Sequence, residues 1–138
     1  MKDVELGRKP SPKEIADETL HQLCEFSTSL ISLSEQSSRL LTDTGDDAAF
    51  QHTFLRLIDG LEVFMDGITT SRAVLGAGGI EAVQALEESF VAITNELVLA
   101  TRTRNEAHRI QILQEVLPVH LREWAEKGIP QLIRSRDS

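Results

Sequence analysis

A Glu-x-x-His turn is the pattern in this sequence that comes closest to a metal site. Glu18 and His21 match it, and helical bundles can hold a di-iron centre with two such turns and two further glutamates. None of the other three histidines has a glutamate three positions before it. We therefore interpret Glu18 and His21 as a solvated pair, with metal binding as the alternative, and we predict no cofactor.

Two further side chains could take part in acid–base or nucleophilic chemistry. His120 lies one helical turn before Trp124, where a half-buried imidazole could change its charge near neutral pH or act as a weak metal candidate. We favour a histidine that packs on the indole at the edge of the core. Cys24 is the only thiol and follows Leu23, which is typical of a small buried hydrophobic residue. Because no nucleophile is paired with a base, we predict a protein that is not an enzyme.

Charged side chains form one acidic stripe and one basic cluster. Asp59, Glu62 and Asp66 recur at helical spacing; they could hold a divalent cation, but a single helix supplies them, which favours a solvated face. Arg102, Arg104 and Arg109 are clustered and could form an anion patch or balance an acidic neighbouring helix. The net charge of −8 repels nucleic acid and argues against its binding, and a helical regulator using these arginines is the third hypothesis.

Composition limits the architecture that must position these residues. The 138 residues suit one domain, and 41% of them are apolar but only 4% aromatic, which favours leucine-rich helices over a sheet. No apolar run approaches the length of about 20 residues that spans a bilayer, and no signal sequence follows Met1. The lone cysteine cannot form an internal disulfide, so we expect a cytoplasmic protein without a membrane partner.

The first half of the chain predicts two long helices. After a flexible tail over residues 1–10, Ser11 can cap a helix over 12–43, with Pro12 at its first position and Glu14 closing a capping box. Gly45 then ends that helix, and Asp46 or Asp47 caps the next, which spans 47–75. The apolar seam that we expect on the first helix is Ala16, Leu20, Leu23, Leu30, Leu33, Leu40 and Leu41.

The second half predicts two more helices. The glycine-rich residues 76–79 end the second helix as a turn rather than a phosphate-binding loop, because no strand precedes them and no P-loop lysine follows. A third helix begins at Ile80 and breaks at 101–106, where Asn105 is the best cap, although one long helix is also possible. The fourth runs over 106–127 with a kink near Pro118, residues 128–130 stop it, and residues 131–134 can add a last turn. Residues 135–138 are expected to fray.

These elements predict an all-α protein whose residues 11–134 form a single up-down-up-down four-helix bundle. Gly60 and Gly67 lie seven residues apart inside the second helix, where each costs about 1 kcal/mol of helix propensity. Close packing against another helix of the bundle, such as the serine-rich face of the first, would compensate. The alternative is a groove that accepts an amphipathic helix from a partner. The candidate partner-binding residues are Leu57, Gly60, Leu61, Phe64, Gly67 and Trp124.

We therefore expect a non-enzymatic cytoplasmic module that binds another protein, or a second copy of itself, through an apolar groove or a dimer face. A bundle that binds a metal or small ligand is the alternative. In size, acidity and helix number the chain resembles the small four-helix export chaperones and adaptors of bacterial flagellar and secretion systems, a resemblance of architecture that transfers no residue roles.

Overall fold

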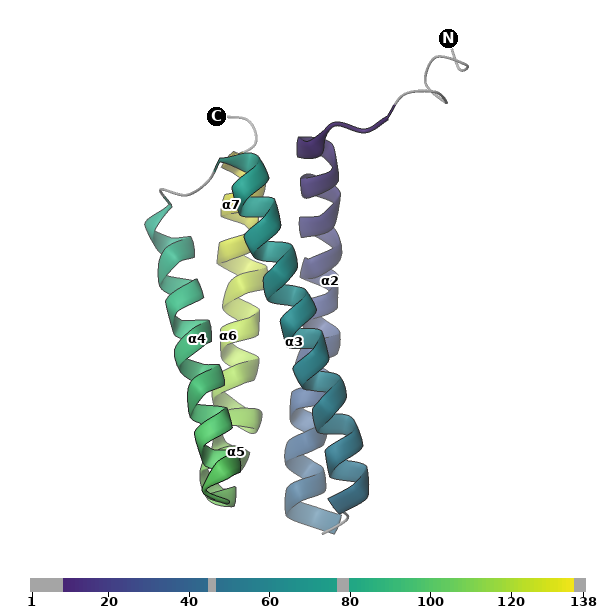
Figure 1. Ribbon diagram of the computed structural model, residues 1–138, viewed down its shortest axis with the longest axis vertical. Helices are drawn as coiled ribbons and strands as arrows, with labels where there is room; N and C mark the ends of the chain where they lie inside the picture. The colour runs from purple at the N-terminus through teal and green to yellow at the C-terminus, as the bar shows by residue number, and fades with distance from the viewer. Residues whose placement is uncertain (1–8, 45–46, 77–79, 136–138) are drawn as a thin grey trace.

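The computed structural model describes residues 9–44, 47–76 and 80–135. Within these ranges the chain forms four antiparallel helical rods and no strand, which confirms the predicted all-α four-helix bundle (Figure 1). No helix in the described ranges combines the length and apolar character needed to cross a bilayer. Of the predicted tails, residues 1–8 and 136–138 lie outside the described residues, whereas Ser135 is still helical.

The first rod is α2 (Pro12–Arg39), which continues into the π-helical turn η1 (Leu40–Thr44). The Ser11 hydroxyl accepts the Glu14 N–H at 3.2 Å, so the predicted N-cap is present. The predicted seam is buried up to Leu30, and beyond it Leu33, Leu40 and Leu41 pack against the edge of the core. Buried positions continue through Ser34, Ser37 and Ser38, while Leu33, Leu40 and Leu41 are only half-buried.

The next two rods are α3 (Asp47–Leu75) and α4 (Glu81–Arg102). Gly76 has φ +66, the left-handed conformation expected after a helix end. The turn after α4 contains Arg104 with φ +55, and Asn105 caps the following helix by accepting the His108 N–H at 3.2 Å. The predicted break between the third and fourth helices is therefore confirmed. The predicted roles of Gly45 and Asp46, and residues 77–79 of the glycine-rich turn, fall outside the described residues.

The last rod, residues 106–135, is called the C-terminal helix here. It consists of α5 (Glu106–Gln111), η2 (Ile112–Val116), α6 (Leu117–Glu123), η3 (Trp124–Gly128) and α7 (Ile129–Ser135), of which η2 and η3 are π-helical turns. The irregularity predicted near Pro118 is present as η2. The predicted stop at residues 128–130 is wrong, because the chain stays helical through Gly128 and Pro130. A Cβ at Gly128 would lie 2.6 Å from the Trp124 ring and 2.8 Å from Leu86, so close packing explains this glycine.

Each π-helical turn of the C-terminal helix accommodates a proline. The Leu117 N–H donates to the Ile112 carbonyl and the Ile129 N–H to the Trp124 carbonyl, five residues back in both cases. The next residue is a proline each time, Pro118 or Pro130, which has no N–H to donate. The Leu113 and Ala125 carbonyls therefore have no backbone donor in the described C-terminal helix. The N–H four residues ahead bonds to the preceding carbonyl, and the residue five ahead is the proline.

Helix α2 supplies side-chain donors to those two carbonyls. Buried Ser34 donates its hydroxyl to the Leu113 carbonyl, and the Cys24 thiol donates to the Ala125 carbonyl at 3.7 Å. Both acceptors are the second residue of a π-helical turn, twelve residues apart on the C-terminal helix. The same kind of side-chain hydrogen bond thus joins α2 to the C-terminal helix at two positions. The need for a donor explains why α2 buries Ser34 where an apolar seam was expected.

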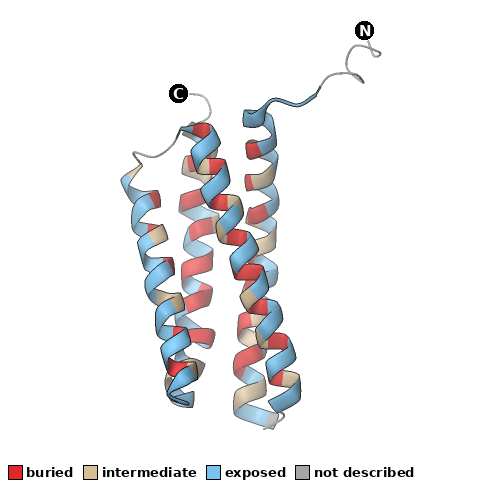
Figure 2. Ribbon diagram, in the orientation of Figure 1, coloured by how far each residue is buried: buried red, intermediate tan, exposed pale blue. Residues whose placement is uncertain are grey.

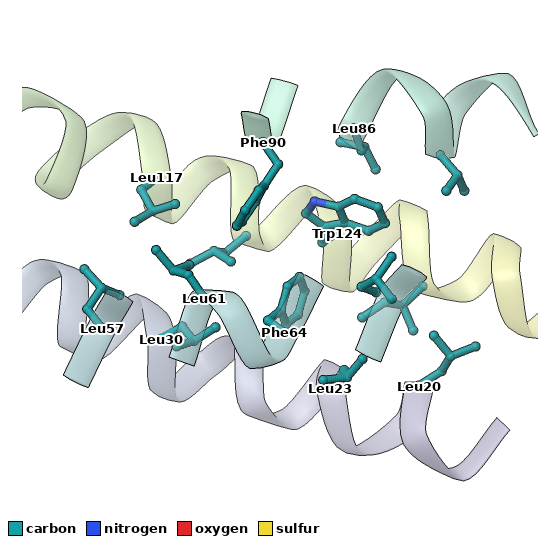
Figure 3. Packing of buried hydrophobic residues seen from close by; sticks show 14 of the residues in the cluster. Leu20, Leu23, Leu30, Leu57, Leu61, Phe64, Leu86, Phe90, Leu117 and Trp124 are labelled. Atoms are coloured by element: carbon teal, nitrogen blue, oxygen red, sulfur yellow. The ribbon is translucent and has the colours of Figure 1, made fainter. Parts of the chain in front are cut away.

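The core lies between the four rods, with exposed residues on their outer faces (Figure 2). Its largest member is Trp124, which is fully buried and meets the Phe64 ring edge-on at a centroid distance of 6.2 Å. Figure 3 shows Phe90 of α4 and Phe64 of α3 beside Trp124 of the C-terminal helix, among the leucines of the core. Large aromatic side chains therefore fill the space that α3, α4 and the C-terminal helix enclose.

Candidate functional site

The predicted glycine strip on α3 is an internal contact with α2. A Cβ at Gly60 would lie 2.5 Å from Leu30 Cδ2 and 3.3 Å from Phe26, and one at Gly67 would lie 2.7 Å from Leu23 Cδ1. Of the two interpretations, these contacts support close packing within the bundle. The glycines face leucine and phenylalanine side chains of α2, however, and not its serines.

The other candidate partner-binding residues are also part of the core. Leu57, Leu61, Phe64 and Trp124 are buried, with at most 3% of their surface exposed. Leu61 nevertheless lies at the floor of a groove on the outside of the bundle, and half-buried Gly67 borders a second groove. Sequence reasoning therefore selected the helix that carries both grooves, but of the residues it named as partner-binding only Leu61 and Gly67 line them.

The first groove, called the α3–α4 groove here, lies where two helices of the bundle do not pack closely. Helix α2 approaches both α3 and the C-terminal helix along much of its length, whereas α3 and α4 make few close backbone approaches in the described chain. The groove has a volume of about 250 Å³. Its lining residues are Ile58, Leu61, Glu62, Met65 and Asp66 of α3 and Phe90, Thr94, Leu97 and Val98 of α4.

The chemistry of the α3–α4 groove is an apolar floor with an acidic rim. Both charged residues that line it, Glu62 and Asp66, are acidic and exposed. Helix α4 contributes no cation to the groove, because its one basic residue, Arg102 at its last position, does not line it. Beyond the groove, toward the C-terminal end of α3, an ion pair between Arg72 and Glu87 joins the two helices.

The second groove lies between the start of α2 and the end of α3 and has a volume of about 450 Å³. Ile15 and Val74 are among its lining residues, with 50% and 38% of their surface exposed. It also contains Gly67 and shares Asp66 with the α3–α4 groove, so the two grooves flank one acidic ridge of α3. Asp66 is the only charged residue among those that line it in the described chain.

The metal candidates do not come together. Exposed His21 lies 3.6 Å from Asp17 on its own helix, Glu18 is exposed beside it, and His120 is buried on α6. Among the described residues no group of three or more histidine, cysteine, aspartate or glutamate side chains is arranged to hold a metal ion. The exposed acidic stripe that includes Asp59 runs along the outer face of α3.

His120 is a buried acceptor for the tryptophan of the core. The Trp124 Nε1–H donates to His120 Nε2 at 3.1 Å, and the Phe90 ring lies 5.8 Å from the imidazole. Burial lowers the pKa of His120 below its ordinary value, and the charge of Glu123 offsets only part of that effect. A neutral imidazole accepts a hydrogen bond where an imidazolium cannot, so this geometry requires the neutral form. His120 contacts the indole as predicted, but it is buried in the core and does not lie at its edge.

The three clustered arginines separate into two groups. Arg104 and Arg109 line the same cavity near the turn between α4 and α5, whereas exposed Arg102 does not line it. The Arg109 guanidinium lies 4.7 Å from the Phe50 ring centroid and 5.4 Å from that of Phe54. Spacing alone could not show this, since the aromatic pair belongs to α3.

No protein-family model matches the chain, and no curated protein or solved structure matches it.

Proposed function

We propose that this protein is a non-enzymatic binding module that receives a basic amphipathic helix of a partner protein in the α3–α4 groove. The observation that carries the proposal is the combination, in one groove, of an apolar floor and an acidic rim that α3 supplies through Glu62 and Asp66. A lone cysteine that cannot form an internal disulfide is compatible with a reducing compartment, and we propose the cytoplasm.

The size of the groove suits a short helical segment. Its α3 wall extends from Ile58 to Asp66, which corresponds to about 12 Å at a rise of 1.5 Å per residue. That length matches two turns of a helix whose apolar side chains lie at positions i, i+3 or i+4, and i+7. The half-buried Met65 lies in the wall, and a flexible thioether can adapt to the shape of such side chains.

The negative charge of the groove favours a partner helix that carries positive charge. Glu62 and Asp66 would lie beside the bound helix, and the lining residues include no cation that would neutralise them. Lysine or arginine residues flanking the apolar face of the partner helix would therefore be attracted, whereas acidic residues would be repelled. The acidic net charge of −8 adds to this preference over longer distances.

The test uses a synthetic helix with leucines at i, i+4 and i+7 and lysines on either side, labelled for fluorescence anisotropy. We expect it to bind, and an otherwise identical peptide with glutamates in place of the lysines not to bind. The double variant Glu62→Lys/Asp66→Lys should weaken binding of the lysine peptide about tenfold. The matched control is Asp59→Lys, which changes an exposed carboxylate of the same helix outside the groove.

A second pair of variants tests the α4 wall. Val98 is 46% exposed and lines the groove, whereas its neighbour Leu99 is 61% exposed and does not. Val98→Arg should reduce affinity about tenfold or more because it fills the groove and repels lysines, and Leu99→Arg should not. Equal loss in both variants, or no binding of the lysine peptide, would refute the proposal. Sedimentation that shows a stable dimer, with Val98→Arg restoring the monomer, would instead assign the groove to a second copy of the chain.

A further inference from the structure

A separate cavity lies at the end of the bundle where α3 begins and α4 passes into α5. It has a volume of about 540 Å³, within the range of sites that hold small organic ligands. Its apolar lining comprises Leu41, Phe50, Phe54 and Leu55, and Arg104 and Arg109 supply positive charge. None of these residues lines the α3–α4 groove.

Arg109 is held on an aromatic platform. The Phe50 and Phe54 rings stack at a centroid distance of 5.1 Å with an interplanar angle of 19°. The guanidinium of Arg109 lies over both rings, a favourable position for a cation. Its Nε atom is buried and has no hydrogen-bond partner in the described chain. Burial lowers the pKa of Arg109, partly offset by the charge of Glu106, but a guanidinium remains charged at neutral pH.

Arg104 reaches the same cavity from a turn with an uncommon backbone conformation. Its φ of +55 is rarely adopted by a residue with a side chain. The turn is held by the Asn105 N–H, which donates to the Ala100 carbonyl at 2.9 Å. Neither Arg104 nor Arg109 forms an ion pair with another residue in the described chain. Two cations therefore face one cavity without a direct counter-ion.

The remaining charges indicate how much negative charge a ligand can carry. Asp47 and Glu106 also line the cavity, so the two arginines are balanced in number by two carboxylates with which they form no ion pair in the described chain. A phosphate with two charges would be repelled by both carboxylates, whereas one carboxylate group can accept N–H donors from the planar guanidinium groups. The apolar lining suits an organic body attached to that group.

We propose that this cavity binds a small organic monocarboxylate, with its carboxylate on Arg104 and Arg109 and its aromatic or alkyl body against the apolar side chains of the lining. The arginines bind the carboxylate through charge-assisted hydrogen bonds from their guanidinium groups. This site is independent of the partner-binding groove.

The test is an NMR titration of the ¹⁵N-labelled protein with 3-phenylpropanoate, its neutral amide and inorganic phosphate. We expect the acid to bind with a dissociation constant on the order of 1 mM and to shift amide signals around residues 50–55 and 101–109. Arg104→Gln and Arg109→Gln should each weaken binding about tenfold. Arg102→Gln is the matched control, since it removes an exposed arginine two residues away that does not line the cavity.

Three results would overturn this inference: no shift with the acid at tens of millimolar, equal binding of the amide, or tighter binding of phosphate. Arg109 also packs on two rings, so its replacement could weaken the fold. Arg104 is exposed, and Arg104→Gln therefore decides the question if Arg109→Gln unfolds. Arg104→Lys should recover part of the affinity, because it restores the charge without the planar guanidinium.

Discussion

Helix α3 has two different neighbours, and the contrast between them explains where a partner could bind. Against α2 its small residues Gly60 and Gly67 let the helices approach so closely that added Cβ atoms would collide with leucines. Against α4 the two helices make few close backbone approaches, and the space is filled from within by large side chains such as Phe64 and Phe90. The distance between packed helices depends on the side chains at their contact.

This difference shows that one helix can pack closely against one neighbour and leave a groove against another. At Gly60 the α2 side is closed by leucine and phenylalanine side chains, and a groove opens on that side only toward the end of α3, beside Gly67. The open side exposes Met65 and Val98 beside two carboxylates. The predictions below test how each side is built, beginning with the largest expected effect.

The first prediction concerns the aromatic filling that keeps α4 away from α3. Trp124→Ala should lower the free energy of unfolding by about 3 to 5 kcal/mol, because it leaves a large cavity beside Phe64. Urea denaturation followed by circular dichroism measures this. The control is Val119→Ala on the same helix, where 51% of the side chain is already exposed. A similar decrease in the free energy of unfolding for both variants would show that the buried aromatic side chains do not dominate the packing between α3, α4 and the C-terminal helix.

The second prediction concerns the closed side. Gly60→Val should destabilise the fold by about 2 kcal/mol, because its methyl groups would overlap Leu30 and Phe26 at a contact that already has no room for a Cβ. Asp59→Val, at the adjacent exposed position of α3, should change stability by about 0.5 kcal/mol or less. A stable Gly60→Val variant would mean that α3 can move away from α2 at little cost.

The third prediction concerns the two hydrogen bonds by which α2 supports the proline-containing turns. Ser34→Ala should cost about 1 to 2 kcal/mol, because the buried Leu113 carbonyl loses its donor. Cys24→Ala should cost less through the Ala125 carbonyl, since a thiol is a weak donor and its contact is longer, at 3.7 Å. Thermal unfolding of the two variants compares them. A greater loss for Cys24→Ala would contradict this explanation of the buried serine.

The smallest effect is expected from pH. The pKa of His120 is lowered in the folded state, so below the ordinary histidine value of about 6.5 the unfolded chain binds more protons than the folded one. The contribution of His120 to the free energy of unfolding should therefore be constant above that pH and decrease as the pH falls below it. His120→Gln can still accept the Trp124 N–H and should show a shallower decrease in Tm from about pH 7.5 to about pH 5.5. Exposed His52→Gln should leave the decrease unchanged.

Most of the fold could be predicted because local signals and tertiary packing agree. Ser11, Pro12 and Asn105 act as caps through their own side chains or φ angles, so sequence alone locates those helix ends. The stop predicted at residues 128–130 was wrong for a physical reason. Pro118 and Pro130 follow π-helical turns whose freed carbonyls find donors on α2, far away in sequence. A rule based on neighbouring residues cannot take account of hydrogen-bond donors such as Ser34 and Cys24, which reach these carbonyls only in the folded chain.

The candidate site was less accessible to prediction. The glycine spacing correctly indicated that α3 makes an unusually close contact, but it could not say whether the contact is internal. The open side is identified by a weaker signal, namely the exposed valine at position 98 and the absence of lysine and arginine from Glu81 to Thr101. That signal indicates a groove only once Met65 and Glu62 of α3 are known to lie across from Val98 of α4. The sequence alone does not give the register between the two helices.

The most direct test of the binding proposal is photo-crosslinking with the lysine peptide carrying a diazirine leucine at one apolar position, followed by mass spectrometry of the adducts. We predict adducts within residues 58–66 of α3 and 90–98 of α4, and their loss in Val98→Arg. Adducts concentrated on residues 12–19 and 70–74, along the other groove, or spread evenly over the surface, would contradict it.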